Sequence, residues 1–421
     1  EIAKEVGDDI CYRALFRFCT YAVINALVAL NDAPPTEEFL AKTVDYLKAL
    51  HSLEADELYY ELSDAERTLS KSRYFKDCDA ETKNECRRLV TLSAKKHKIS
   101  EAEAATLFLT RDPFERKPSI ASRLYFPVLG IMTAVFSVVS LVVTKNPAFF
   151  FFTLLPMSEG AKQLTDYVFS HLVRTVPIPK KKLKKLPDGA KTLTVITSLL
   201  TGKEADLELC GKIRDCAFAN KDGNAYFGLL CDLKEADSPT SPSDRETEKR
   251  IADAVDEMNE KYGINIILFL RDRRYAPSED KYMGWERKRG AIIELTRYLK
   301  EQSTSIRVLC GDPSPIFETK YVITLDSDTR LYTGAVHDFV GTMLHPSNTP
   351  VIKDGKVVKG HAILQPKMEG SLLPAEKTPY TVLTSDGSGD IYGSASYETY
   401  QSIFGEGIFC GKGIFDLDAY S

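Results

Sequence analysis

The second half of the sequence alternates between short apolar runs and amphipathic segments, and this alternation restricts the fold more than any other feature. Apolar, β-rich runs and helical patterns follow one another at 192–200, 203–219, 225–231, 247–261, 264–270, 290–300 and 321–325. Strands that are joined through helices pair in parallel with right-handed crossovers. The pattern therefore predicts an α/β fold with a mostly parallel sheet.

The last of these strands ends in two carboxylates, which form the strongest candidate for a functional site. Asp326 and Asp328 follow the apolar run 321–325 directly. Ligands of open α/β sheets bind beyond the carboxyl ends of the strands, and two carboxylates in such a cleft need a cation between them. Their oxygens favour Mg²⁺ or Mn²⁺, often together with substrate phosphates. We therefore expect a metal and a nucleotide diphosphate here; the alternative is an ordinary polar turn.

A basic stretch after the third strand is a second candidate, for binding a nucleotide. It contains the single tryptophan, Trp285, and then Arg287, Lys288, Arg289 and Gly290. Cations at the start of a helix oppose its dipole, and they are best tolerated where they share an anion with the backbone N–H groups. The stretch predicts a diphosphate or nucleotide pocket, although a basic surface loop with a packed tryptophan has the same composition.

Two isolated acidic residues are weaker candidates. Asp232 ends the second strand, where a carboxylate can accept hydrogen bonds from a base or ribose, but a turn aspartate is the simpler interpretation. Glu406 lies in a glycine-dense stretch, 404–413, that permits close backbone approach to a ligand. It could bind the hydroxyls of an acceptor sugar or be a turn residue. The Gly/Ser-rich stretch 385–396 predicts a mobile loop over a substrate.

Two apolar runs precede the α/β part. Residues 124–143 carry no charge and match the length of about 20 residues that crosses a bilayer. The run 148–173 is diluted by polar residues, so it predicts a second membrane helix or an interfacial one; two buried core helices are the alternative. Basic residues flank the pair at Arg116, Lys117, Arg123, Lys180, Lys181, Lys182, Lys184 and Lys185. Under the positive-inside rule they predict an inner-membrane protein with its α/β part on the cytoplasmic side.

The remaining features limit the function less. The region 1–118 predicts a helical accessory domain, with helix starts at Thr36, Ser63 and Ser100 and no catalytic spacing. We expect the hairpin to occupy 119–175 and the α/β core 176–421. Nine scattered cysteines without a Cys-x-x-Cys pair predict reduced thiols rather than zinc ligands. A net charge of −5 offers no argument for nucleic-acid binding.

An ordered series of motifs from residue 187 onward resembles the glycosyltransferase domain of the cyclic β-1,2-glucan synthases. The motifs lie at 193–200, 285–290 (WERKRG), 324–330 (TLDSDTR), 341–346 (GTMLHP), 363–366 (ILQP), 404–407 (FGEG) and 411–414 (GKGI). The membrane hairpin and the helical N-terminal region also lie where that family has them. The resemblance implies a GT-A type, inverting transferase that uses UDP-glucose and a divalent metal to extend a glucan acceptor.

The resemblance also implies roles for individual residues. Asp326 and Asp328 match the metal and diphosphate motif of the family, and Asp232 matches a position near the nucleotide. Lys288, Arg289 and Gly290 resemble the basic motif that faces the nucleotide. The family's catalytic base, further membrane helices and a phosphorylase-like domain lie beyond the position of Ser421. We therefore expect an N-terminal portion with an incomplete core; neither Asp416 nor Asp418 is assigned as the base, and Glu406 is a weak candidate for it.

Two other functions agree with the same residues. One is a cellulose-synthase-like transferase with another linkage or donor, which linkage analysis of the product would distinguish. The other is a non-catalytic, membrane-bound module that binds a nucleotide sugar, as a scaffold or sensor. Binding of UDP-glucose without turnover would support the second.

Overall fold

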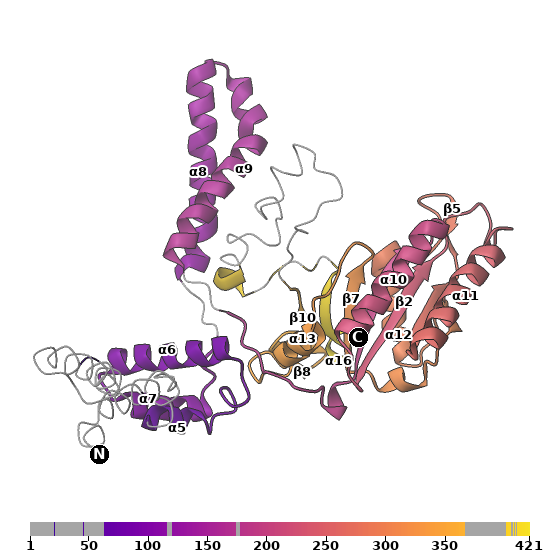
Figure 1. The fold of residues 1–421 in the computed structure, drawn as a ribbon. Coiled ribbons are helices and arrows are strands. Elements are labelled where there is room, and N and C mark those ends of the chain that lie inside the picture. Colours follow the sequence, from indigo (N-terminus) through magenta and orange to yellow (C-terminus); the bar gives the residue numbers. More distant parts are fainter. Residues whose placement is uncertain are drawn as a thin grey trace, which may run out of the picture. The chain divides into compact units, whose positions relative to one another are not determined.

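The computed structural model describes Tyr21, Asp45 and the ranges 63–115, 120–173, 177–366, 401–405, 407, 409 and 411–421. The chain divides into two compact units, Glu1–Pro113 and Phe114–Ser421, which are described separately (Figure 1). The hairpin and the sheet therefore belong to one unit by their contacts. The finer division predicted from the sequence, into 1–118, 119–175 and 176–421, stays a prediction.

Three helices form the described part of the first unit: α5 (Asp64–Leu69), α6 (Ala80–His97) and α7 (Glu101–Thr110). Ser63 caps α5 by accepting a hydrogen bond from the backbone N–H of Glu66. Ser100 and Glu103 form a reciprocal capping box at the start of α7. Both helix starts predicted at Ser63 and Ser100 are thus confirmed. The start predicted at Thr36 lies outside the described residues.

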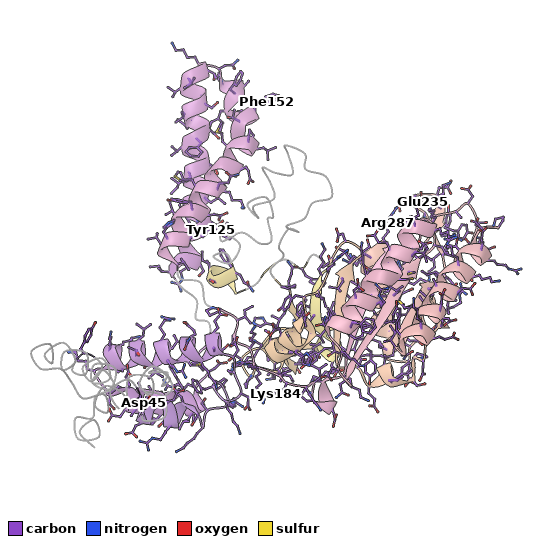
Figure 2. The ribbon with its side chains drawn as sticks, in the orientation of Figure 1. Asp45, Tyr125, Phe152, Lys184, Glu235 and Arg287 are labelled. Carbon is purple, nitrogen blue, oxygen red and sulfur yellow. The ribbon has the colours of Figure 1, made fainter. Side chains whose placement is uncertain are left out.

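Two long helices, α8 (Ile120–Thr144) and α9 (Pro147–Leu172), open the second unit and pack side by side as a hairpin (Figure 1). Figure 2 shows Phe152 near the turn of this hairpin and Tyr125 toward its open end. There the Tyr125 hydroxyl contacts Asp166, and Lys162 Nζ lies 2.9 Å from the same carboxylate. Among the described residues, α8 is the one helix that is long and apolar enough to cross a membrane.

The outer surface of the hairpin is apolar and largely exposed. Val139 of α8 and Phe152 of α9 are 55% and 84% exposed, and other large apolar residues of both helices are exposed as well. The interpretation of these runs as buried core helices therefore does not hold for this structure. A face of this kind needs an apolar partner.

A seven-stranded sheet forms the centre of the second unit, in the order β10-β11-β7-β1-β2-β3-β6. Its strands are β1 (Thr192–Leu199), β2 (Ala225–Asp232), β3 (Ile266–Arg271), β6 (Ile306–Cys310), β7 (Tyr321–Asp326), β10 (Ile363–Leu364) and β11 (Gly413–Asp416). The four central strands, β7, β1, β2 and β3, pair in parallel. The α/β fold with a mostly parallel sheet is thus confirmed.

The edges of the sheet differ from the prediction, because antiparallel strands close it on both sides. β6 pairs antiparallel with β3. It lies between β3 and β7 in the sequence, and the sequence analysis did not predict it. β11 pairs antiparallel with β7, and β10 with β11. β6 is short and only partly buried, so it lacks the continuous apolar run by which the central strands are recognised.

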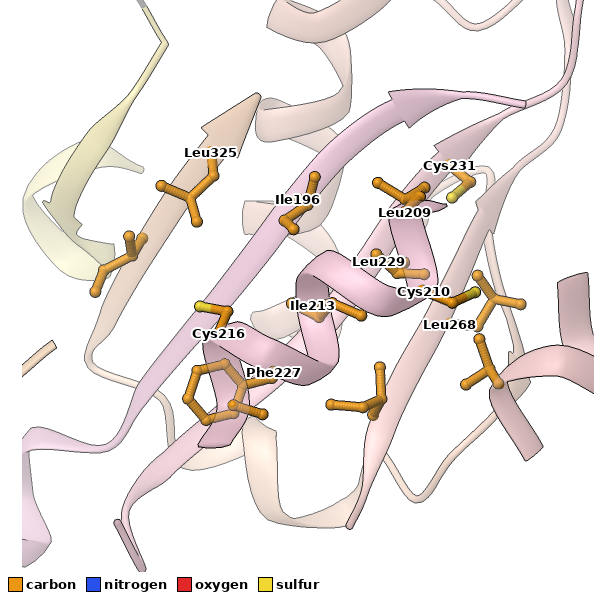
Figure 3. Packing of buried hydrophobic residues seen from close by; sticks show 14 of the residues in the cluster. Ile196, Leu209, Cys210, Ile213, Cys216, Phe227, Leu229, Cys231, Leu268 and Leu325 are labelled. Atoms are coloured by element: carbon orange, nitrogen blue, oxygen red, sulfur yellow. The ribbon is translucent and has the colours of Figure 1, made fainter. Parts of the chain in front are cut away.

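Helices cover both faces of the sheet. The core on one face includes residues of α10 (Lys203–Ala219), α11 (Asp244–Tyr262) and α13 (Ala335–Met343), and the core on the other includes residues of α12 (Arg287–Leu299). Figure 3 shows Leu209 and Ile213 of α10 lying over strand residues such as Ile196 and Leu229. Because both faces are covered, the central strands are buried at most positions, and β1 and β7 bury threonines such as Thr192, Thr194 and Thr324 beside their apolar residues.

The smaller elements are η2 (Asp188–Ala190), β4 (Arg274–Ala276), β5 (Lys281–Met283), η3 (Ser314–Glu318), β8 (Val351–Lys353), β9 (Lys356–Lys359) and α16 (Leu417–Tyr420). β8 and β9 form a hairpin around Asp354 and Gly355, which both have positive φ, as such a two-residue turn requires. Burial raises the pKa of Cys210 to about 11 and that of Cys216 to about 12, so these thiols are inert at neutral pH.

Candidate functional site

The register of the parallel strands brings charged residues to one edge of the sheet. Asp326 ends β7 opposite Thr197 of β1, and Asp232 ends β2 beside Arg271, the last residue of β3. All of these are carboxyl ends, because the strands run in the same direction. The sequence-predicted carboxylates Asp232 and Asp326 therefore lie on the same edge.

Asp326 and Asp328, here called the acidic pair, both lie close to one ammonium group. Lys412 Nζ lies 3.1 Å from Asp326 Oδ2 and 3.5 Å from Asp328 Oδ1. Lys288 Nζ donates a hydrogen bond to the other oxygen of Asp326. The Asp326 side chain is 29% exposed and that of Asp328 is 77% exposed. Both carboxylates thus face a single point at which a cation is already held, with one side open to solvent.

Lys412 reaches this point because β11 is paired with β7. Gly413, the first residue of β11, lies opposite Thr324, and the Thr324 hydroxyl donates a hydrogen bond of 3.0 Å to the carbonyl of Gly411. Lys412 lies between these two anchored glycines. The sequence analysis noted the glycine-dense stretch but did not name Lys412; a single lysine between two glycines was the available signal.

Lys288 approaches the pair from the first turn of α12 and passes close to Gly411. A Cβ atom at Gly411 would lie 2.9 Å from both Cε and Nζ of Lys288, and the φ of Gly411 is +83°. The backbone conformation therefore favours glycine at this position, whereas the end of the Lys288 side chain could move aside for a Cβ. Lys288 thus lies beside Asp326, and its role in binding a nucleotide stays a prediction.

The other two cations of the basic stretch point elsewhere. Arg287 contacts Glu279 at 2.9 Å and Glu235 at 3.6 Å, and Figure 2 shows Arg287 and Glu235 at the same end of the sheet. Arg289 lies 3.4 Å from Glu286 on the adjacent turn. The helix begins at Arg287 rather than at Gly290, so all three cations belong to its first turn. Of the three, Lys288 contacts the acidic pair.

Asp232 is engaged by a buried arginine. Arg271 Nε and Nη2 donate to the two Asp232 oxygens at 2.7 Å and 2.5 Å, and the Arg271 side chain is 0% exposed. The same guanidinium donates to the carbonyls of Trp285 and Arg287, at 3.0 Å and 2.9 Å. Asp232 therefore orients the Arg271 guanidinium, which in turn binds the backbone at the start of α12. Sequence reasoning missed Arg271, although a charged residue at the end of an apolar strand was visible.

Two glycines permit this packing. A Cβ at Gly284 would lie 2.6 Å from Asp232 Oδ2 and from Arg271 Nη2. A Cβ at Gly290 would lie 1.8 Å from the Trp285 carbonyl oxygen. Gly290 is thus required because the backbone before α12 comes so close.

A third lysine holds the turn between the two acids. Lys212 of α10 donates a hydrogen bond of 2.7 Å to the Ser327 carbonyl and lies 2.9 Å from Glu208. The Thr197 hydroxyl donates to the Leu325 carbonyl at 3.2 Å. The turn is therefore fixed from two neighbouring elements.

The contacts of Asp328 and Lys412 favour the charged form of both side chains. Burial by itself would raise the pKa of Asp328, but hydrogen bonding from Thr329 and the positive charge of Lys412 outweigh it and lower that pKa. Burial by itself would lower the pKa of Lys412, but Asp326 and Asp328 outweigh it and raise that pKa. Asp328 and Lys412 are consequently both ionised at neutral pH.

The pair is suited to a divalent cation of the hard type. Lys412 Nζ shows that a cation fits between the two carboxylates. Across the described ranges, no group of three or more His, Cys, Asp or Glu side chains is placed to share a metal. Asp326 and Asp328 could therefore hold Mg²⁺ or Mn²⁺ if water or a phosphate completed the coordination, which is the usual arrangement for Mg²⁺.

The remaining acidic candidates are separate from this pair. Glu406 and the stretch 385–396 lie outside the described residues. Asp416 is buried and caps α16 by accepting hydrogen bonds from the backbone N–H groups of Asp418 and Ala419, at 3.0 Å and 3.1 Å. A structural task therefore accounts for Asp416.

The fold and site together define an α/β protein whose mostly parallel sheet presents a lysine-bridged pair of aspartates at its carboxyl edge and which follows an apolar helical hairpin in the sequence. No family model matches the chain. A curated relative, "Cyclic beta-(1,2)-glucan synthase NdvB" of Rhizobium meliloti (strain 1021), is 33% identical over 276 residues, which cover 63% of the chain and 10% of the relative. The chain is therefore similar to a part of a cyclic β-1,2-glucan synthase, the family that its motifs resemble. The matched part spans about a tenth of that relative's length.

Proposed function

We propose that the chain is the glucosyltransferase part of a membrane-anchored glucan synthase. It transfers glucose from UDP-glucose to a growing β-1,2-glucan, with inversion at the anomeric carbon and with a divalent metal. The observation that carries the proposal is the convergence of Asp326 and Asp328 on a single cation position at the carboxyl edge of the sheet. The identity to a cyclic β-(1,2)-glucan synthase supports the sugar and the linkage.

The acidic and basic residues of the site would have different roles in binding the donor. Asp326 and Asp328 would hold the metal, which when bound would offset the negative charge of the departing diphosphate. Lys288 would donate a hydrogen bond to the same phosphates, because it lies against Asp326 in the first turn of α12. Arg271 and Asp232 would keep the loop of Trp285 in place beside the nucleotide. Such a core would be of the GT-A type.

The acceptor hydroxyl would attack the anomeric carbon from the face opposite the diphosphate. This geometry converts an α-linked donor into a β-linked product. The group that accepts the proton of the hydroxyl is not assigned. Asp416 is a poor choice for it, because two backbone N–H groups already occupy its carboxylate.

The hairpin would anchor this part of the protein to the inner membrane. Its exposed apolar side chains provide a surface for lipid, and α8 has the required length. The lysines at 180–185 follow the hairpin and would meet anionic headgroups on the cytoplasmic side.

The test is Asp328→Asn in the membrane-inserted protein. The substitution removes one charge from the cation position without changing side-chain shape. We expect transfer of labelled glucose from UDP-glucose to fall by at least about a hundredfold, with an unchanged melting temperature. Linkage analysis of the wild-type product should show β-1,2 bonds.

Asp215→Asn is the matched control. Asp215 is an exposed, ion-paired aspartate on the surface of α10, and its substitution should leave transfer unchanged. Full activity in Asp328→Asn would remove the acidic pair from the mechanism. Binding of UDP-glucose by the wild-type protein without any transfer would instead favour a non-catalytic nucleotide-sugar-binding module.

A further inference from the structure

Three lysines from three elements surround the turn that carries Asp326 and Asp328, and they do not all make the same kind of contact. Lys212 of α10 contacts a backbone carbonyl, that of Ser327. Lys288 of α12 and Lys412 before β11 contact the carboxylates themselves. Only the latter two therefore compete directly with a metal for the aspartate oxygens.

The two carboxylates are already neutralised by these two ammonium groups. A divalent cation that enters alone must displace both lysines and would add two positive charges beside them. A cation that enters together with a diphosphate meets no such obstacle, because phosphate oxygens are strong acceptors for the displaced ammonium groups. The local charge therefore favours joint entry of metal and diphosphate.

The chain around Lys412 allows its side chain to move between two partners. Its side chain is 21% exposed and bears a flexible four-carbon stem. Gly411 and Gly413 flank it with φ of +83° and +154°, conformations that favour glycine. The stem of Lys288 lies directly beside Gly411, and both ammonium groups contact the same carboxylate, that of Asp326, one at each oxygen.

We propose that Lys412, together with Lys288, is an exchangeable counter-ion of the donor site. With no ligand bound it neutralises Asp326 and Asp328, and on binding it passes from the carboxylates to the diphosphate of the sugar nucleotide as the metal takes its place. This inference rests on the proposed function and adds Lys412 to the residues that bind the donor. It follows that metal and nucleotide bind with positive and reciprocal coupling.

The test is Lys412→Met in the detergent-solubilised chain, with two binding readouts that need no turnover. Electron paramagnetic resonance measures the binding of Mn²⁺ alone. The fluorescence of Trp285, the single tryptophan, measures the binding of UDP in the presence of Mn²⁺. We expect the affinity for Mn²⁺ alone to rise at least about fivefold and the affinity for UDP to fall at least about fivefold, the lower end of typical coupling.

A rise in the affinity for Mn²⁺ together with a fall in the affinity for UDP distinguishes an exchangeable Lys412 from one with a merely structural role. Lys191→Met is the matched control, because Lys191 is likewise a carboxylate-paired lysine of similar exposure, 22%, but its partner is Glu318 at the other end of β1. It should change neither affinity. Lys212→Met should weaken both ligands together, since it loosens the turn that presents both acids.

Lys412→Arg is a second variant, which keeps the test informative if Lys412→Met does not fold. It retains the charge, so its affinity for Mn²⁺ alone should stay as low as that of the wild type. If Lys412→Met lowers both affinities together, or changes neither, the exchange is wrong while the proposed function stands. If the wild-type chain binds neither Mn²⁺ nor UDP, both proposals fail.

Discussion

At the scale of single residues, Gly290 and Gly211 show how position decides what a glycine does. Both lie inside helices, where alanine is normally the better residue by about 0.5–1 kcal/mol. A Cβ at Gly211 in α10 would meet nothing within 4 Å, whereas a Cβ at Gly290 in α12 would lie 1.8 Å from a backbone oxygen. Helix propensity therefore decides the effect of alanine at Gly211, and steric contact decides it at Gly290.

We predict opposite effects of alanine at these two positions. Gly211→Ala should raise the free energy of unfolding by about 0.5–1 kcal/mol. Gly290→Ala should lower it by roughly 1–3 kcal/mol, because the Trp285 carbonyl cannot move aside by a side-chain rotation. Urea unfolding followed by circular dichroism measures both. A stabilised Gly290→Ala protein would show that the loop before α12 is looser than described.

The same scale shows what the residue pattern could reveal about the site. Asp326, Asp328 and Lys288 were predicted from local features, a strand end and a basic helix start, and the structure brings all three together. Lys412 and Arg271 were not predicted. Their partners lie far away along the chain, so the glycines beside Lys412 and the apolar strand before Arg271 do not indicate which side chains they contact.

At the scale of elements, one buried guanidinium connects two strands and a helix. Arg271 ends β3, binds Asp232 at the end of β2, and donates to two carbonyls at the start of α12. Glu294 of α12 lies 3.8 Å from it and is also buried. The position of the first turn of α12, and with it that of Lys288, depends on this arrangement.

We predict that Arg271→Met lowers the free energy of unfolding by roughly 3–5 kcal/mol, since it leaves Asp232 without its buried partner. The emission of Trp285 should shift as its loop is released. Arg307→Met on the neighbouring strand β6 is the control. Arg307 pairs with Glu248 and Asp272 at the surface, so its loss should cost less than about 1 kcal/mol. Equal effects of both substitutions would contradict the assignment.

The elements also show where a strand pattern fails. α10 begins and ends as predicted, because its apolar positions repeat with the helical period between two clear strands. β6, β10 and β11 were not predicted as strands of the sheet. Each lies at or near its edge and is short, so neither length nor continuous apolar character identifies it.

At the scale of the whole molecule, the proposed membrane anchoring depends on the exposed apolar surface of the hairpin. Val135 and Val139 lie four residues apart on one face of α8 and are about half exposed. We predict that the double variant Val135→Asp, Val139→Asp no longer remains in membranes after carbonate extraction, because an aspartate at the centre of a membrane helix costs roughly 2.5–3.5 kcal/mol.

The control for this experiment is Leu207→Asp. Leu207 is an equally exposed apolar residue on α10, and its variant should stay in the membrane fraction. If carbonate releases the wild-type protein as well, α8 does not span a bilayer. In that case the exposed face of the hairpin would need a protein partner.

The amino-acid sequence by itself determined the alternation of strands and helices, the mostly parallel sheet and the two carboxylates at its edge, because burial and secondary structure leave periodic patterns within short stretches. Only the tertiary structure decided which cations face those carboxylates. Lys412 meets them because β11 pairs antiparallel with β7, and Arg271 meets Asp232 because β3 lies in register beside β2. Such contacts join residues that are distant in the chain, so no local pattern records them.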